Sequence, residues 1–377
     1  MVIKNAKICD KDGLREGNFT IEDRTDTVID AKGAYLIPAL VDLNVRLNDG
    51  VLNSKNIQEV SLEAKKGGIG HLVLNGDSSP SIDNEGILEF AQNGLRDAEG
   101  ASVDVMLNAL QHDGSLSNIA ILLKKGAISP YMSTIAKNDI AIKIAEYMKM
   151  YGNTLFVKAE DNSLISSGVM LDGDVSSRLG LAGIPDLSEV LHVSRMIEIA
   201  RHFKIKILFK SIASPRSISL ITQAKKEGVA VSCEVSLHHL INSDEACEGF
   251  NTVAKLDPPL ASASDVKLLQ DALVSGQIDI LTTLHQPSSP VNKEVAFYDA
   301  AYGCESISDA LPLYYTKLVK TGLINIERLI ELTSINPSKV IGKKVSYILF
   351  NSESRSIINN PQSLYNNEEI YGEVISL

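Results

Sequence analysis

The chain has 377 residues, of which 44% are hydrophobic, and this is enough for one large core or for two domains. Its net charge of −11 is spread along the chain and argues against nucleic acid as the main partner, because phosphate binding requires a basic face. A charged N-terminus, four cysteines without paired spacing and no apolar run of roughly 18 residues predict a cytoplasmic protein with reduced thiols, no signal peptide and no membrane span.

The two ends of the chain share one pattern, in which short alternating strands are separated by turn residues. The pattern covers residues 2–10, 17–23 and 26–36 near the start, and residues 345–353 and 369–377 near the end. We expect both ends to meet in one small β-sandwich domain, formed by residues 1–38 together with residues 341–377.

Between the ends, apolar strand patterns alternate with helical patterns whose apolar residues recur every three or four positions. This order favours a TIM-type (β/α)8 barrel domain of the α/β class over residues 39–340. A doubly wound open sheet with a dinucleotide site is disfavoured, because no glycine-rich turn follows the first strand. The eight predicted strands lie at residues 39–47, 71–77, 102–110, 126–132, 154–161, 204–210, 229–237 and 278–284.

The first predicted barrel strand lies within "LIPALVDLNVRLND", residues 36–49, and raises a question about metal binding. It passes through Asp42 and ends at a cluster of polar side chains, which is how a barrel enzyme presents its ligands. The polar side chains here are Asn44 and Arg46, however. A neutral amide is a weak ligand, and a guanidinium group offers only donors and repels a divalent cation.

A series of motifs along the chain indicates which protein family the predicted barrel resembles. They are, in order, "VIDAKGAYLIPALVDLNVRL", "VKAEDNSLISSGVM", "VSCEVSLHHLINSDE", "KLDPPLAS" and "LTTLHQPSS". Through these motifs the chain resembles the dihydroorotases of the amidohydrolase superfamily over nearly its whole length. The resemblance implies the barrel fold, a site at the barrel mouth and a place in pyrimidine biosynthesis.

The resemblance also implies which positions would hold metal. In the family, two metals are bound by a His-x-His pair, a carboxylate and two further histidines, and an aspartate serves as general base. Zinc requires three or four nitrogen, oxygen or sulfur ligands, and the residues at these six positions do not supply them. We therefore predict no metal, no cofactor and no catalytic residue at the degenerate positions, which are Asn44, Arg46, Tyr131, Lys158, Phe209 and Leu284.

The positions that bind substrate in the family have changed as well. The carboxylate-binding arginine corresponds to Asn48, its companion asparagine to Asp77, and the asparagine of the Asn-Pro-Pro-Leu-Arg motif to Asp257. A histidine corresponds to Ser288, whereas His285 is retained. Because two carboxylates oppose an anionic substrate, we expect no substrate binding at these positions.

The replacements change the charge of the barrel mouth. We hypothesise that Arg46 and Lys158 fill the space of the two metals, paired with Asp42, Asp77 or Asp257, because buried charges require partners. A Schiff-base role for Lys158 is disfavoured, since no base or phosphate loop accompanies it in the sequence.

Two histidines, a cysteine and a further lysine are also candidates for metal binding, catalysis or anion binding. His238 and His239 are adjacent, and neighbouring residues on a strand point to opposite faces, so structural hydrogen bonds are favoured over joint metal binding. Cys304 is expected to be a small buried residue rather than a catalytic thiol. Lys210 forms, in one alternative, a small anion pocket with the two cations of the mouth.

The favoured interpretation is a non-catalytic dihydroorotase homologue whose barrel is kept for assembly. The resemblance implies a partner, because some bacteria encode an inactive dihydroorotase-like chain that scaffolds the catalytic subunit of aspartate transcarbamoylase. A homo-oligomer is also expected. The alternatives are an active dihydroorotase, which hydrolyses the cyclic amide of dihydroorotate to carbamoyl aspartate with unusual ligands, a metal-free small-anion-binding protein, and a free-standing regulatory homodimer.

Overall fold

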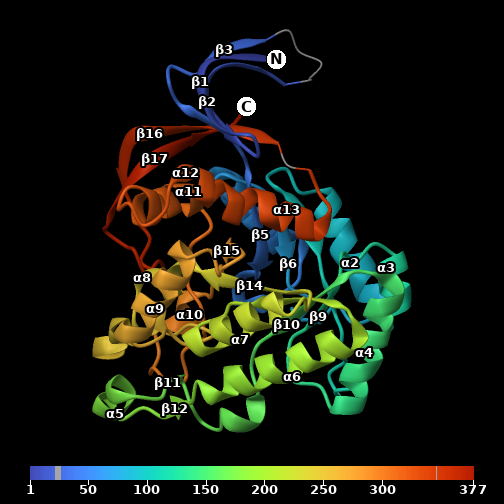
Figure 1. Cartoon of the computed structure of the whole chain (residues 1–377). Coiled ribbons are helices and arrows are strands. Elements are labelled where there is room, and N and C mark those ends of the chain that lie inside the picture. Colours follow the sequence, from blue (N-terminus) through green and yellow to red (C-terminus); the bar gives the residue numbers. More distant parts are fainter. Residues whose placement is uncertain (22–26, 345) are drawn as a thin grey trace.

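The computed structural model describes residues 1–21, 27–344 and 346–377, and its central feature is a barrel of parallel strands (Figure 1). Parallel pairing runs from β5 through β6 to β7, and from β8 through β9, β10, β13 and β14 to β15. Since β7 and β8 are two parts of one barrel strand separated at Met106, the predicted (β/α)8 order is confirmed. The strands are β5 (Leu40–Val45), β6 (Ile69–Leu74), β7 (Ser102–Val105), β8 (Leu107–Asn108), β9 (Pro130–Met132), β10 (Thr154–Lys158), β13 (Lys206–Lys210), β14 (Val231–Ser236) and β15 (Ile280–Thr282).

The barrel closes where the segment after β15 meets the first strand. The backbone N–H of Arg46 donates to the carbonyl oxygen of His285 at 2.9 Å, and the backbone N–H of Thr283 donates to a carboxylate oxygen of Asp42 at 2.9 Å. One of the two closing bonds therefore uses a side chain, so that Asp42 belongs to the framework of the barrel.

The helices around the barrel begin and end at residues that suit those positions. The side chains of Asn53, Asn84 and Ser262 accept backbone N–H bonds at three helix starts, and Gly152 takes the left-handed conformation, at φ 74°, where α4 ends. The longer helices are α1 (Ser54–Lys66), α2 (Glu85–Arg96), α4 (Asn138–Tyr151), α6 (Leu187–Phe203), α7 (Pro215–Lys226) and α9 (Ala263–Val274). Shorter ones are α3 (Ile119–Lys124), α11 (Ala310–Tyr314), α12 (Ile326–Ile330) and α13 (Asn336–Ile341).

Side chains alternate along the barrel strands between an inner and an outer apolar layer. The inner layer fills the barrel and includes Leu43, Tyr131 and Phe156, all buried. The outer layer packs between strands and helices and includes Phe209, which is fully buried there. The barrel interior is therefore a packed core, and the open space begins above it.

Short elements cover the end of the barrel where the strands finish. They are β11 (Met170–Leu171), α5 (Asp174–Leu179), β12 (Gly183–Ile184), α8 (Leu237–Ile241) and α10 (Pro290–Lys293). Two buried lysines fix the segment 290–302 on this side. Lys255 Nζ donates to three backbone carbonyls of the segment at 2.7–2.9 Å, and Lys293 Nζ donates to two carbonyls at 2.8 and 2.9 Å.

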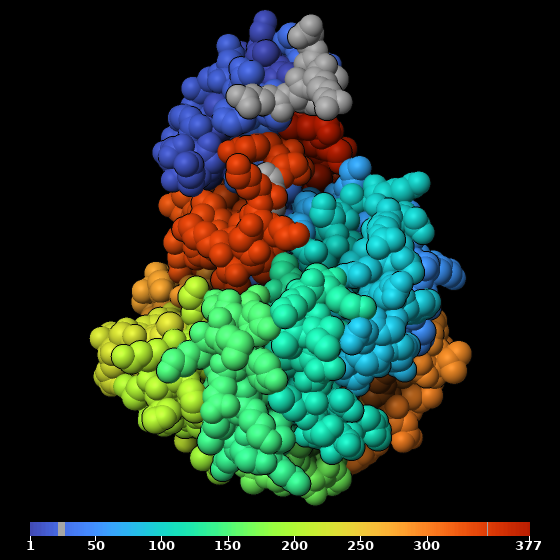
Figure 2. All heavy atoms as spheres, turned by 90° about the vertical axis from the view of Figure 1, so that its right-hand side faces the viewer, coloured from blue at the N-terminus to red at the C-terminus, as the bar shows by residue number. Residues whose placement is uncertain are grey.

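Both chain ends contribute to a six-stranded sheet beside the barrel, with the order β17-β16-β4-β1-β2 and β3 paired with β1. Figure 1 places N and C close together on it, and in Figure 2 the blue and red segments lie side by side above the barrel. The predicted meeting of both ends is thus confirmed, with all six strands hydrogen-bonded into one sheet, although the predicted segments at 17–23, 26–36 and 345–353 extend partly outside the described residues. Its strands are β1 (Val2–Asp10), β2 (Gly13–Thr20), β3 (Val28–Asp30), β4 (Tyr35–Pro38), β16 (Tyr347–Ile357) and β17 (Glu369–Ile375).

No helix in the described part of the chain combines the length and the apolar character that a membrane crossing requires.

Candidate functional site at the barrel mouth

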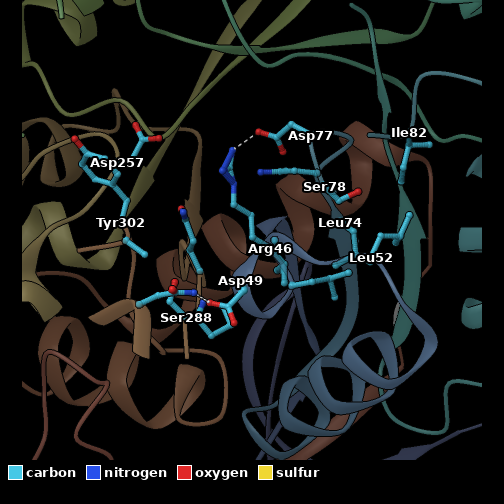
Figure 3. A pocket seen from close by; sticks show the side chains of 18 residues that line it. Arg46, Asp49, Leu52, Leu74, Asp77, Ser78, Ile82, Asp257, Ser288 and Tyr302 are labelled. Atoms are coloured by element: carbon cyan, nitrogen blue, oxygen red, sulfur yellow. Dashed lines mark hydrogen bonds and ion pairs between the residues drawn. The ribbon is translucent and has the colours of Figure 1, made fainter. Parts of the chain in front are cut away.

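A cavity of about 300 Å³ lies at the carboxyl ends of the first barrel strands (Figure 3). Arg46 projects into its centre from the end of β5, Asp77 follows β6, and Asp257 and Tyr302 form the opposite wall. The carboxyl ends of barrel strands are where enzymes of this fold place their chemistry. This cavity is therefore the candidate site.

The Arg46 guanidinium group is held by an ion pair. Its Nη2 lies 2.6 Å from a carboxylate oxygen of Asp77 and donates to the hydroxyl of Tyr131 at 3.3 Å. Burial opposes the charge, but the carboxylates of Asp77 and Asp257 outweigh it and raise the pKa of Arg46. Arg46 thus stays cationic in the place where the family resemblance implies a metal-binding histidine.

A second cation, Lys158, stands at the end of β10 and contacts two carboxylates. Its Nζ lies 2.8 Å from Asp257 and 3.1 Å from Glu160. Although burial opposes it, this pair of carboxylates raises the pKa of Lys158, and the nearby lysine helps to lower the pKa of Asp257. Arg46 therefore pairs with Asp77 and Lys158 with Asp257, which are two of the three partners that the hypothesis offered.

Below these ion pairs lies a fully buried polar network. Asn44 Nδ2 donates to Ser211 Oγ at 2.6 Å and to Glu234 at 2.7 Å, and its amide oxygen accepts from Asn75 at 2.8 Å. Lys210 Nζ donates to the carbonyl of Leu43 at 2.7 Å and also to the amide oxygen of Asn75. Amide, hydroxyl and ammonium groups thus fill the space at the end of β5.

Burial acts in opposite directions on the two ionisable members of this network. It lowers the pKa of Lys210 and raises the pKa of Glu234, because each group loses the water that would stabilise its charge. The Lys210 ammonium lies 4.9 Å from the ring centre of Tyr131, which also contacts Arg46. Lys210 therefore lies beneath Tyr131 and does not face the cavity, which argues against the predicted anion pocket of three cations.

Asp42 does not pair with Arg46 or Lys158, contrary to one option of the sequence hypothesis. Its two oxygens accept from the hydroxyl groups of Thr282 and Thr283 at 2.6 and 2.5 Å and from two backbone N–H groups at 2.9 Å. Thr282, Thr283 and the backbone N–H of Asn44 occupy both oxygens of this carboxylate, so Asp42 serves the barrel framework rather than the ion pairs of the mouth.

On the sixth barrel strand, the family position was matched to the wrong residue. Phe209 was assigned to the site, but it points into the outer core, because side chains alternate along a strand and its neighbour Lys210 points inward. Ser211 and Glu234 were missed as members of the site, and Lys210 was named only as part of the alternative anion pocket. The signal that would have placed Lys210 is the two-residue period of the strand: Leu208 lies in the inner layer, so Lys210 shares its face, whereas Phe209 shares the outer face of Ile207.

The other predicted positions are dispersed around the mouth. Leu284 is buried and has a positive φ of 51°, and Ser288 lines the cavity. Asn48 begins a short turn of helix and lines a neighbouring pocket together with Ser288 and His285. The structure thus gathers Asn44, Arg46, Tyr131, Lys158, Asp77 and Asp257, but leaves Phe209 and Asn48 apart from them.

The adjacent histidines lie on helix α8 and not on the preceding strand, which ends at Ser236. His239 bonds to the hydroxyl of Ser236 at 2.7 Å and to the carbonyl of Pro258 at 3.1 Å, while His238 bonds to the Tyr365 hydroxyl at 3.2 Å and lies 3.4 Å from Cys304 Sγ. Burial raises the pKa of Cys304 to about 12, so the thiol stays protonated.

The residues of the mouth do not fit the pair of metals that the family implies. Arg46 and Lys158 are cations, Tyr131 is a phenol whose pKa is raised by burial, and none of these binds a divalent ion without losing a proton. Among the described residues, no group of three or more His, Cys, Asp or Glu is arranged to hold a metal ion.

Solved structures of known proteins share this architecture. The chain superimposes over 99% of its length on 93% of an L-hydantoinase (dihydropyrimidinase) from Arthrobacter aurescens, with a TM-score of 0.82 and 20% sequence identity. A D-hydantoinase (dihydropyrimidinase) from a Thermus species gives a TM-score of 0.82 at 19% identity, over 99% of this chain and 92% of that one. The chain therefore shares its fold, a barrel with a terminal sheet, with these two hydantoinases.

Sequence comparison identifies the family to which the chain belongs. A family profile described as "Dihydro-orotase-like" matches residues 33–210. The dihydroorotase of Elusimicrobium minutum is 33% identical over 98% of this chain and 90% of its own length, and that of Acetivibrio thermocellus is 33% identical over 85% and 77%. The chain belongs to the dihydroorotase family.

Buried neutral histidines predict a marked acid sensitivity. Burial lowers the pKa of His238 and His285 to about 3 and that of His192 and His239 to about 4, from an ordinary value of 6.5. The folded state therefore binds fewer protons than the unfolded state below pH 6.5, and the stability present above that pH is lost as the pH falls toward 4.

His192 offers the test, because neither of its ring nitrogens has a hydrogen-bond partner among the described residues. Urea unfolding of His192→Leu between pH 4.5 and 6.5 should show a shallower pH slope, by an amount that is largest near pH 5 and stays below about 1.4 kcal/mol per pH unit, the limit for one full proton. The exposed His112 supplies the control, since His112→Leu should leave the slope unchanged. Equal slopes for both variants would contradict the assignment of His192 as a neutral buried group.

Proposed function

We propose that this member of the dihydroorotase family does not hydrolyse dihydroorotate, and that it serves pyrimidine biosynthesis as a structural partner of the aspartate transcarbamoylase catalytic subunit. The observation that carries the proposal is the pair of ion-paired cations, Arg46 with Asp77 and Lys158 with Asp257, at the positions of metal-binding histidines. A metal hydroxide is the nucleophile of metal-dependent amide hydrolysis, and cations at its ligand positions oppose its formation.

The residue at the general-base position and the buried Glu234 support the same conclusion. Leu284 stands at the position of the general base and has no proton acceptor in its side chain. Glu234 is fully buried beneath the network, where Asn44 and the backbone N–H of Ser211 engage one of its oxygens. Hydrolysis requires a base within hydrogen-bond reach of an attacking water, and these groups do not supply one at the cavity.

The assembly role rests on the family resemblance and on the retained fold. The barrel and its terminal sheet persist although the polar residues of the mouth have been exchanged, and a scaffold requires the outer surface of the barrel rather than its mouth. Inactive dihydroorotase-like chains that scaffold aspartate transcarbamoylase are the precedent, and a homo-oligomer would present several binding surfaces at once.

An active dihydroorotase is the second candidate, favoured by the 33% identity to the Elusimicrobium minutum dihydroorotase over 98% of this chain. It would require ligands other than the residues at the family positions. A metal-free anion-binding protein is less well supported, because Arg46 and Lys158 are both already paired with carboxylates.

Two measurements on the purified chain test the proposal. The first is zinc content together with hydrolysis of dihydroorotate, with and without chelator, and we expect no bound zinc and no turnover. The second is size-exclusion chromatography with aspartate transcarbamoylase, where we expect co-migration and a changed transcarbamoylase activity. Chelator-sensitive turnover would establish the active enzyme instead, and separate elution would refute the scaffold role.

Restoring the His-x-His pair should not restore activity. In Asn44→His/Arg46→His the metal site would still lack the ligands at positions 131 and 158, while Lys158 would keep its positive charge at the site. We expect no dihydroorotate hydrolysis above the buffer rate with added zinc, and a lower thermal midpoint because Asp77 loses its cation. The control is Lys55→His, an exposed change on α1, which should leave the midpoint unchanged.

A further inference from the structure

A second pocket, of about 260 Å³, lies beside the barrel mouth between α1 and the loops that follow β15. We call it the acidic pocket, because its lining includes the carboxylates of Glu59, Glu63 and Glu305 and contains no lysine or arginine. It shares Pro287 and Ser288 with the cavity of the mouth but not Arg46. The cations that neutralise the mouth therefore do not line this pocket.

The carboxylates of the acidic pocket are poorly compensated. Burial and the neighbouring carboxylates of Glu305 and Glu59 raise the pKa of Glu63. Among the described residues, the one ion pair of these three glutamates is between Glu59 and Lys55 on the exposed side of α1, at 3.6 Å, and Glu305 instead accepts from Asn360 at 2.6 Å. Lys66 offsets part of the repulsion at Glu63, but burial and the two neighbouring carboxylates outweigh it. An excess of negative charge of this kind favours a ligand that carries positive charge.

A buried histidine of the same pocket is incompletely bonded. His285 lines the acidic pocket and is 1% exposed, its Nδ1 accepts from the backbone N–H of Ser306 at 3.3 Å, and its Nε2 has no partner among the described residues. Because burial keeps the ring neutral and Nδ1 is an acceptor, Nε2 carries the proton and requires an acceptor. Gln362 Oε1, also in the lining, is a buried acceptor without a donor.

From these groups we infer that the acidic pocket binds an organic cation, an ammonium or guanidinium group carried next to a carbonyl oxygen. The cationic head contacts Glu63 and Glu305. His285 Nε2 and Gln362 Oε1 each expose less than 1 Å² in this structure, so the side chains of the pocket wall shift on binding to let the first donate to the carbonyl and the second accept from the cation. A metal ion fits less well, because no three acidic or histidine side chains of the described residues are arranged to ligate one. A free basic amino-acid derivative and the basic side chain of a partner protein both offer this chemistry.

Isothermal titration of the full chain tests the inference with argininamide and with the peptide acetyl-Gly-Gly-Arg-Gly-Gly-amide. Saturable binding that weakens with added salt is expected for at least one of them. Tighter binding of argininamide would point to a small metabolite, and tighter binding of the peptide to a partner's side chain. If neither probe binds, the inference is wrong.

Variants locate the binding. Glu63→Gln/Glu305→Gln should weaken it by about tenfold or more, because charge-assisted hydrogen bonds to two carboxylates are lost. The matched control is Glu89→Gln on α2, which is exposed and does not line the pocket, and it should bind as the unmodified chain does. Circular dichroism verifies that both variants fold. Binding that survives the double change would place the ligand elsewhere and overturn the inference.

Discussion

Replacement of Lys210 by methionine is expected to destabilise the protein by about 3–5 kcal/mol, since it removes one partner of a buried charged network. Lys210 is 3% exposed, and Glu234, whose charge it balances, is fully buried. Methionine fills a similar volume but donates no hydrogen bond, so the carbonyl of Leu43 and the amide oxygen of Asn75 would lose their donor. Urea unfolding at pH 7 measures the loss.

The same strand provides the control. Lys206 lies at the exposed start of β13, and Lys206→Met should change the stability by less than about 0.5 kcal/mol. Adding Glu234→Gln to Lys210→Met should recover part of the loss, because the unpaired buried charge disappears. A Lys210→Met variant as stable as Lys206→Met would show that the network contributes nothing to folding, and that Lys210 is neutral or hydrated.

The ion pairs of the mouth could be predicted from the sequence, because new cations and new carboxylates both replace the residues that the family resemblance implies. Arg46 and Lys158 replace neutral or metal-bound groups, and Asp77 and Asp257 replace neutral asparagines of the resemblance, so the added charges balance. A buried cation requires a partner, and Asp77 follows β6, the barrel strand beside the one that leads to Arg46. The hypothesis therefore included both observed partners without knowledge of any distance, although it did not assign them to their cations and also included Asp42, which does not pair.

The buried polar network beneath these ion pairs could not be predicted from the sequence in the same way. Asn44, Asn75, Ser211 and Glu234 come from four separate strand ends, and their hydrogen bonds depend on the register of each strand. A shift of one residue exchanges the inner and outer faces of a strand, which is how Phe209 was placed in the site although Lys210 occupies it. Matching motifs fixes a strand's identity more securely than its register.

The sandwich expected for the terminal segments illustrates a related limit. Alternating patterns predicted the strands and their common domain, but the pairing partners depend on contacts between residues more than 300 positions apart, such as Leu36 with Leu349. One continuous sheet results because β4 pairs with both β1 and β16. Local patterns do not contain that information.

Replacement of Asp42 by alanine is expected to be about as damaging as the loss of Lys210, at roughly 3–5 kcal/mol, because one carboxylate satisfies four donors in a buried position. The donors are two hydroxyl groups, of Thr282 and Thr283, and two backbone N–H groups. Alanine leaves all four without an acceptor and loosens the joint between the first and last barrel strands.

Hydrogen exchange distinguishes this local joint from a general loss of stability. In Asp42→Ala the backbone amide of Thr283, which donates to Asp42, should exchange faster than the amides of β10 and β13 on the far side of the barrel, because its own acceptor is gone. Asp271→Ala on the exposed face of α9 is the matched control and should change neither unfolding nor exchange. Uniformly faster exchange around the barrel would contradict the closing role of Asp42. Faster exchange confined to Thr283 and its neighbours would instead show that the Asp42 carboxylate holds the barrel closed through Thr282 and Thr283.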